Sequence, residues 1–177
     1  MARSRYKIIE KKEPHFLTCT IVDWIPLFTD ISIINILLES MTFLQKQKRL
    51  ILYSYVIMKD HLHLIASAIN LSKEIGNYKS FTARKIVDML KESGDKYLLS
   101  KLRSAKLSHK KKSTYQVWQE GSHPEAIQGP EMMRQKIEYI HYNPVRAKYV
   151  ENPVDWKYSS SSNYELGYGV LEVTTEW

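Results

Sequence analysis

The chain has 177 residues, of which 44% are hydrophobic and 25% charged, with only 6 glycines and 6 prolines. This length and composition indicate one globular domain over residues 1–177 and exclude collagen-like, low-complexity and wholly disordered chains. Polar side chains interrupt the most apolar stretch, residues 25–44, so we expect no membrane-spanning helix. Because Cys19 is the single cysteine and no signal peptide is recognisable, we expect a cytoplasmic protein without disulfides.

Positive charge is concentrated in one part of the sequence. Lysine and arginine number 26 against 19 acids, a net charge of +7, and the stretch from Lys96 to Gln119 holds seven cations and no acid. Such a surface attracts polyanions, nucleic acid first, although a solvated helix face explains the charge run equally well. The candidate DNA-binding residues from charge are Arg3 and Arg5 in a basic arm (residues 1–14), and Lys101, Arg103, Lys106, Lys110, Lys111 and Lys112.

The order of predicted elements indicates an α+β fold. Alternating apolar residues predict a strand over residues 15–22, and Asp30 is expected to cap a helix that ends near residues 45–49. We then expect a hairpin from residues 50–58 and 61–67, a helix from Ser72 to Gly94, a strand around residues 115–118, a helix over residues 130–143 and an irregular tail over residues 150–177. This order is typical of one antiparallel sheet with helices packed on one face.

A first candidate site lies on the second strand of the predicted hairpin. His61 and His63 are separated by one residue, so both side chains emerge on the same face of the strand. Two adjacent imidazoles can share a divalent cation. A chance pair with ordinary polar partners is the competing interpretation, and the spacing alone does not decide between the two.

A second candidate site lies on the last predicted helix. Tyr139 and Asn143 are four residues apart and therefore lie on one face of the helix, where a phenol can act as a nucleophile and an amide oxygen as a metal ligand. The alternative is that Tyr139 packs in the core and Asn143 only ends the helix before Pro144. Tyr142 is the reserve candidate for the nucleophile.

Four sequence blocks, taken together, resemble the single-tyrosine HUH transposases, and particularly the REP-associated tyrosine transposases. The blocks are MKDHLHLI (58–65), VWQEG (117–121), YIHYNPVRA (139–147) and WKYSS (156–160), and the resemblance covers about residues 15–160. It implies a ferredoxin-like antiparallel sheet and a late helix carrying the tyrosine. One departure is Lys59-Asp60, where relatives commonly have Pro-Asn.

The resemblance also implies the roles of the site residues. It makes His61, His63 and Asn143 the ligands of a divalent metal, Mg or Mn, and Tyr139 the nucleophile that forms a 5′-phosphotyrosine with DNA. The expected partner is single-stranded DNA with hairpin structure, contacted also by Arg146, and a homodimer in which the tyrosine helix serves the other subunit is an open alternative.

Two other functions remain open from the sequence. One is a protein of the same fold that binds hairpin DNA or RNA without cleaving it. The other is a zinc hydrolase in which His61 and His63 share the metal with His15, His123 or His141.

Overall fold

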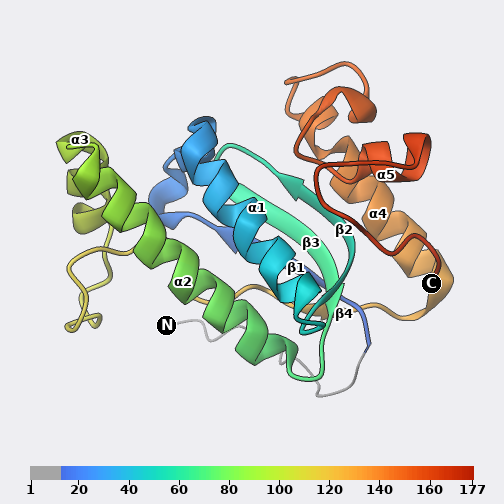
Figure 1. Cartoon of the computed structure of the whole chain (residues 1–177), viewed down its shortest axis with the longest axis horizontal. Helices are drawn as coiled ribbons and strands as arrows, with labels where there is room; N and C mark the ends of the chain where they lie inside the picture. Colours follow the sequence, from blue (N-terminus) through green and yellow to red (C-terminus); the bar gives the residue numbers. More distant parts are fainter. Residues whose placement is uncertain (1–12) are drawn as a thin grey trace.

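The computed structural model describes residues 13–177, so the predicted contacts of Arg3 and Arg5 lie outside the described residues. The elements in chain order are β1 (His15–Thr20), α1 (Ile31–Lys46), β2 (Ile51–Ile57), β3 (His61–Ser67), α2 (Leu71–Glu92), α3 (Lys96–Ser104), β4 (Glu125–Ala126), α4 (Gly129–Arg146) and α5 (Ser161–Leu166) (Figure 1). Three short 3-10 turns, η1 (Val22–Trp24), η2 (Leu27–Thr29) and η3 (Pro153–Asp155), join them.

One four-stranded antiparallel sheet, in the order β2-β3-β1-β4, forms the centre of the molecule. β3 is an inner strand, and its pairing with β1 places His63 opposite Thr18 and His61 opposite Thr20. With α1 between β1 and β2, and α2 followed by the short α3 between β3 and β4, this is the ferredoxin-like arrangement. The predicted α+β fold class is confirmed.

The helices begin and end where local side-chain chemistry permits. The carboxylate of Asp30 accepts a hydrogen bond from the backbone of Ser32 at the start of α1, as the sequence predicts. Asn70, rather than the predicted Ser72, caps α2 by accepting from the backbone of Lys73. Gly94 lies just after α2 with φ of 73°, a left-handed conformation that closes a helix at little cost in glycine.

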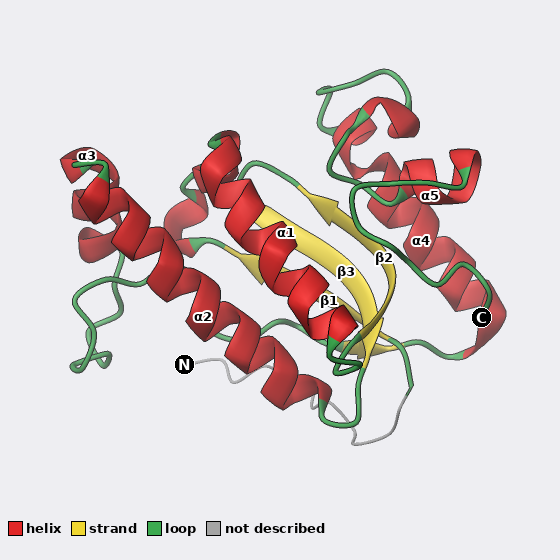
Figure 2. Ribbon diagram, viewed as in Figure 1, coloured by secondary structure: helices red, strands yellow, loops and turns green. Residues whose placement is uncertain are grey.

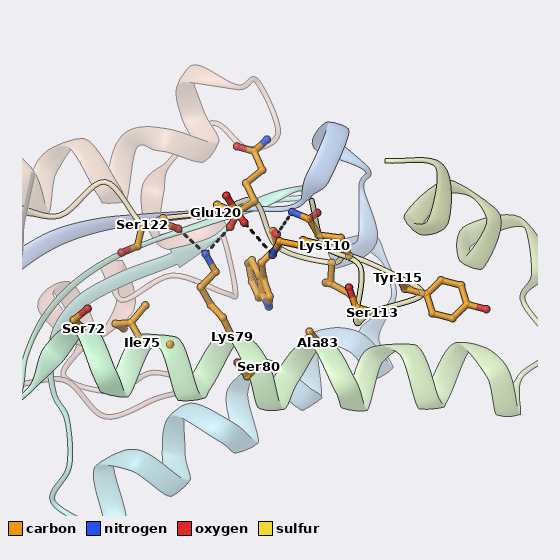
Figure 3. A pocket seen from close by; sticks show the side chains of 16 residues that line it. Ser72, Ile75, Lys79, Ser80, Ala83, Lys110, Ser113, Tyr115, Glu120 and Ser122 are labelled. Atoms are coloured by element: carbon orange, nitrogen blue, oxygen red, sulfur yellow. Dashed lines mark hydrogen bonds and ion pairs between the residues drawn. The ribbon is translucent and has the colours of Figure 1, made fainter. Parts of the chain in front are cut away.

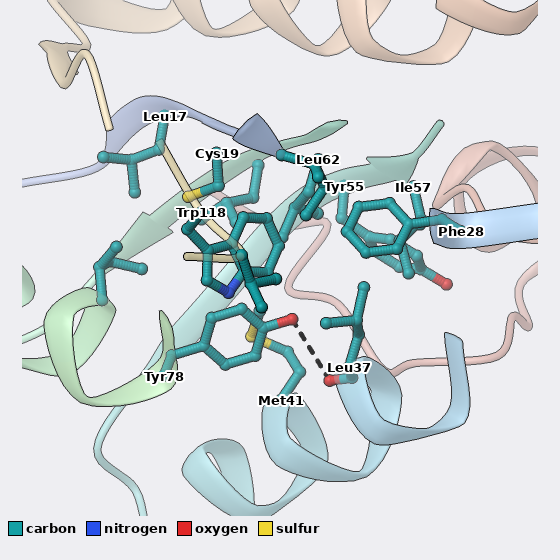
Figure 4. Packing of buried hydrophobic residues seen from close by; sticks show 14 of the residues in the cluster. Leu17, Cys19, Phe28, Leu37, Met41, Tyr55, Ile57, Leu62, Tyr78 and Trp118 are labelled. Carbon is teal, nitrogen blue, oxygen red and sulfur yellow. Dashed lines mark hydrogen bonds between the residues drawn. The ribbon is translucent and has the colours of Figure 1, made fainter. Parts of the chain in front are cut away.

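The two faces of the sheet carry different cores. Leu62 and Leu64 of β3 point toward α1 and α2, which cross the sheet side by side (Figure 2), and they belong to the larger buried cluster around Tyr78 and Trp118 (Figure 4). On the opposite face, Ile65 joins a smaller cluster with residues of α4, among them Met133, Ile137 and Ile140. Burying each such side chain stabilises the fold by about 1.5–3 kcal/mol, so α4 is firmly attached to the face that carries the histidines.

Two predictions about the elements are wrong, one on the fourth strand and one on the end of the last helix. The stretch around Trp118 forms only an isolated bridge to Ile21, and the fourth strand is Glu125–Ala126, between that stretch and α4, where no strand was predicted. The last helix does not end at Asn143 but continues to Arg146 with Pro144 inside it. Pro144 has no N–H to donate, yet its own carbonyl accepts from the backbone of Tyr149, so the helix loses one bond and keeps its course.

The tail closes the outer edge of the sheet instead of remaining irregular. Backbone hydrogen bonds join Ile57 to Tyr158 and Tyr55 to Ser160 along β2, each 2.9 Å long, and Thr174 donates to the carbonyl of Leu52 at 2.8 Å. Ser159, Ser160 and Ser161 are fully buried. Within residues 13–177 no helix combines the length and the apolar character that crossing a bilayer requires.

Candidate active site

The two histidines lie together on the face of β3 that α4 covers. Their ring centroids are 4.7 Å apart, and the planes are inclined by 72°. His63 is 5% exposed, whereas His61, nearer the end of the sheet, is only partly buried. The alternation of the strand therefore produces the juxtaposition that the sequence predicts, with Leu62 and Leu64 directed into the opposite core.

Each imidazole is oriented by an oxygen atom at its Nδ1. Asp60 Oδ1 lies 2.6 Å from Nδ1 of His61, and Thr18 Oγ1 lies 2.9 Å from Nδ1 of His63. A carboxylate only accepts, so Nδ1 of His61 carries the proton and its Nε2 keeps a free lone pair. The tautomer of His63 that donates from Nδ1 to Thr18 frees its Nε2 in the same way. Histidines held in this manner are typical of metal ligands.

The neutral state of the His63 ring favours metal binding. Burial, and then the repulsion that a protonated His61 and Lys136 exert on a second positive charge, lower the pKa of His63 to about 3. The ring is therefore neutral at physiological pH, the state in which imidazole ligates a cation. The sequence gives no signal for the size of this shift, because the burial of His63 and the proximity of Lys136 both depend on how α4 packs against the sheet.

Tyr139 of α4 faces His63 in the same chain. The two ring centroids are 5.4 Å apart in an edge-on arrangement, and Phe16 of β1 packs 5.8 Å from the tyrosine ring. The Tyr139 side chain is still 40% exposed. Arg146 lies 5.3 Å above the tyrosine ring and donates to the Tyr139 carbonyl at 3.3 Å. The nucleophile candidate is thus held beside a histidine and remains accessible to a large substrate.

Asn143 follows one turn after Tyr139. The four-residue spacing keeps Asn143 on the face of α4 that carries Tyr139, and Tyr139 lies against Phe16 and His63. Within residues 13–177 its half-buried amide makes no hydrogen bond. The reserve candidate Tyr142 instead lines a separate cavity of about 340 Å³ between α4 and α5, so the structure does not bring it to the histidines.

The donor set fits a divalent cation with mixed nitrogen and oxygen ligation. In the described part of the chain no three His, Cys, Asp or Glu side chains gather into a metal site. His15, His123 and His141 therefore do not complete a site with His61 and His63, which removes the basis for the zinc hydrolase. Two imidazole nitrogens, with the amide oxygen that the resemblance expects from Asn143, would leave room for phosphate oxygen, and Mn or Mg accepts such a mixture.

The remaining candidate DNA-binding residues lie at two places. Arg146 is beside Tyr139, as described above. Lys101 and Arg103 are on α3, and Lys106, Lys110, Lys111 and Lys112 are in the connection that follows it, at the opposite end of the molecule from α4 (Figure 1). Lys106 and Lys110 are partly engaged, by the Lys110 carbonyl and by Glu120 respectively, while Lys101, Arg103, Lys111 and Lys112 are exposed.

The VWQEG block (117–121) does not lie beside the histidines, and its role is structural. It lines a cavity of about 630 Å³ between α2 and residues 110–122 (Figure 3). The ammonium of Lys79 donates there to the carbonyls of Gln119 and Gly121 at 2.7 and 2.5 Å, and burial lowers its pKa. Gln119 and Ser122 in turn bond to the backbone of β1, so this segment supports the strand that carries Thr18.

Sequence reasoning missed Thr18 and Asp60. Asp60 precedes His61 directly, so its proximity was visible in the sequence. Thr18 lies 45 residues from His63, and only the pairing of β1 with β3 brings them together.

A ferredoxin-like sheet in which two histidines on an inner strand face a tyrosine on a covering helix defines a class, the single-tyrosine transposases. Comparison with known families agrees: residues 9–105 match the family described as Transposase IS200 like. Because this match spans more than half of the chain, the chain belongs to the IS200-like transposase family.

Two relatives extend the comparison. Over 104 residues the chain is 30% identical to a Haemophilus influenzae protein whose assignment as a REP-associated tyrosine transposase is provisional. That match covers 59% of this chain and 54% of the relative, so the chain spans about half the length of the curated relative that it matches. A solved REP-associated tyrosine transposase bound to a REP hairpin is similar in fold, with a TM-score of 0.68 at 16% identity over 100% of this chain and 94% of the other.

Proposed function

We propose that this chain is a metal-dependent enzyme that nicks and rejoins single-stranded DNA at hairpin-associated sites, with Tyr139 as the nucleophile. The observation that carries the proposal is the contact of the Tyr139 and His63 rings within one chain, 5.4 Å between centroids. A nucleophile and a pair of metal-binding imidazoles are thereby held on one accessible face. Family membership and a fold shared with a REP-associated transposase support the same function.

In the proposed reaction the Tyr139 oxygen attacks a backbone phosphorus atom. A bond forms between that oxygen and phosphorus, the bond from phosphorus to the 3′ oxygen breaks, the phenol releases its proton and the departing 3′ oxygen takes one up. The products are a 5′-phosphotyrosine and a free 3′-hydroxyl, and the covalent link preserves the energy needed for rejoining. His61, His63 and Asn143 would hold a divalent cation, which when bound would neutralise phosphate charge and stabilise the leaving oxygen.

The residues around the site have separate parts in this proposal. Asp60 and Thr18 orient the imidazoles, and Phe16 supports the tyrosine ring. Arg146 offers a cation beside Tyr139 for the DNA backbone. The cations of residues 101–112 supply backbone contacts to the hairpin at the α3 end. Because Tyr139 meets His63 in its own chain, we propose that one chain of a single domain completes the site, so that a homodimer is not required for chemistry.

The test is formation of a covalent protein–DNA adduct. The substrate is a pool of hairpin DNA with randomised single-stranded flanks, labelled at the 3′ end and incubated with Mn, and a denaturing gel is expected to show a labelled protein band. Mass spectrometry is expected to locate the phosphate on Tyr139. Tyr139→Phe should abolish the band, whereas Tyr142→Phe, a matched control on the same helix with similar exposure, should retain it.

The binding-only alternative predicts a different result. Hairpin DNA would then bind with equal affinity to the wild type and to a His61→Ala, His63→Ala variant, with no adduct at any metal concentration. An adduct that persists undiminished in Tyr139→Phe would reject Tyr139 as the nucleophile.

A further inference from the structure

A lysine next to the histidine strand is fixed over an aromatic ring. The ammonium of Lys59, in the turn between β2 and β3, lies 4.1 Å from the centroid of the Tyr149 ring, the closest cation–ring approach among the described residues. Over residues 13–177 no carboxylate lies within 4.0 Å of this ammonium, and the Lys59 side chain is exposed. An oriented cation without an acidic partner among residues 13–177 is available to an anion from solution.

The ring that holds Lys59 is itself anchored. Tyr149 packs 5.5 Å from Trp156, and the Trp156 indole donates to the carbonyl of Ile57 at the end of β2. The Tyr149 backbone N–H donates to the carbonyl of Pro144 at 2.9 Å. Lys148, between them, has φ of 59°, a left-handed conformation that costs a residue other than glycine about 1 kcal/mol. This bend after α4 turns Tyr149 back toward the strand turn.

Lys59 is held on the side of the sheet where the proposed chemistry takes place. It precedes His61 by two residues, so their Cα atoms are separated by at most about 7 Å. Hydrogen bonds from Phe28 to the Lys59 carbonyl and from Ile21 to the Asp60 carbonyl, 2.9 and 2.8 Å long, fix the backbone of the turn. Trp156, which supports Tyr149, packs against the smaller core cluster on the α4 side of the sheet.

We propose that Lys59 binds the backbone phosphate next to the scissile one, and that Tyr149 is the residue that positions it. This inference rests on the proposed function and adds a subsite for a single-stranded DNA phosphodiester. Trp156 and Lys59 both pack against the Tyr149 ring, so its part is to hold the cation rather than to stack on a base. Arg146, which lies over the Tyr139 ring, provides a second cation next to the proposed nucleophile.

The test measures binding without chemistry. All variants are made in the Tyr139→Phe background without metal, and anisotropy of fluorescein-labelled oligothymidylate gives the affinity over a series of salt concentrations. Each phosphate contact on single-stranded DNA contributes about 0.7 to the slope of log affinity against log salt. Lys59→Gln is therefore expected to reduce the slope by about 0.7. The matched control is Lys85→Gln, which removes an equal charge from a lysine over Phe81 on α2 and should leave the slope unchanged.

Two further variants test whether Tyr149 positions Lys59. Tyr149→Phe keeps the ring and should bind as the background protein does. Tyr149→Leu should weaken binding of the oligothymidylate. In a protein that already carries Lys59→Gln, adding Tyr149→Leu should cause no further loss, because the two residues act through one contact. Equal slopes in Lys59→Gln and Lys85→Gln would overturn the phosphate contact. Additive losses of affinity in the variant that combines Lys59→Gln with Tyr149→Leu would overturn the positioning role of Tyr149.

The adduct assay separates this inference from the proposed function. An adduct at Tyr139 together with an unchanged slope in Lys59→Gln would reject the subsite and leave the enzyme intact. A reduced slope without any adduct from the protein carrying Tyr139 would reject the position next to a scissile phosphate and leave Lys59 only as a contact of a DNA-binding protein.

Discussion

The buried histidine of α4 makes the stability of the protein dependent on pH. His141 is 8% exposed, and its Nε2 lies 2.9 Å from Ser160 Oγ and 3.3 Å from Ser54 Oγ. Burial lowers its pKa to about 4. In the unfolded chain a histidine titrates near 6.5, so the unfolded state takes up a proton first as pH falls. Stability is therefore fully present above about pH 6.5 and is lost progressively down to about pH 4.

The size of the effect follows from these two pKa values. Between pH 7.5 and pH 5 the contribution of His141 to the free energy of unfolding falls by about 2 kcal/mol, and by about 3 kcal/mol once the pH is below 4. His63, with its pKa lowered to about 3, adds a loss of about 2 kcal/mol over the same upper range. The assay is urea unfolding at pH 7.5 and pH 5, followed by tryptophan fluorescence.

A variant isolates the share of His141. His141→Gln keeps a nitrogen donor for the serines and cannot titrate, so its difference in stability between the two pH values should be about 2 kcal/mol smaller than that of the wild type. His63 and all other groups titrate alike in both proteins and cancel in the comparison. An equal pH dependence of the two proteins would refute the assignment of the shift to His141.

Three further predictions concern the site and its supports. Thr18→Val should weaken Mn binding about 10-fold in calorimetry because it frees the His63 ring, whereas Thr18→Ser should bind normally; equal affinities of wild type and Thr18→Val would contradict the orienting bond. Ile140→Ala removes a fully buried side chain between α4 and the sheet and should lower the free energy of unfolding by about 3 kcal/mol in urea, and a loss below about 1 kcal/mol would show that α4 is loosely packed. Ser160→Ala leaves the buried backbone N–H of Tyr55 without its acceptor and His141 with Ser54 alone, so it should cost about 2 kcal/mol in the same assay; an unchanged midpoint would contradict the network.

The parts of the fold that depend on local chemistry could be predicted from the sequence. Asp30, Gly94 and the strand turn at Lys59-Asp60 mark ends of elements through interactions within a few residues, and the structure has each at that place. No strand forms around Trp118, because the aromatic residues of this stretch pack in the core beside α2 while its backbone makes only an isolated bridge. Two residues at Glu125–Ala126 suffice for an outer strand and are too few to produce a periodic pattern.

The site was predictable where spacing along one element fixes geometry. His61 and His63 share a face by strand alternation, and Tyr139 and Asn143 share one by helical spacing, whatever the rest of the chain does. The contacts between elements were not predictable from spacing. Thr18 meets His63 only through the register of β1, and the charge of Lys136 acts on His63 only because α4 packs against the sheet.

The tail bonded along β2 also determines how copies of this protein can meet. Residues 156–160 and 174 occupy the peptide groups of one border strand, and the other border, β4, is only two residues long, with Glu125 paired to Lys136. Neither border offers a free row of amides onto which a neighbouring chain can add a strand. Truncation before Trp156 would expose such a row, and aggregation through strand addition is the expected consequence. The serines of the tail thus help to prevent the addition of further strands to this sheet.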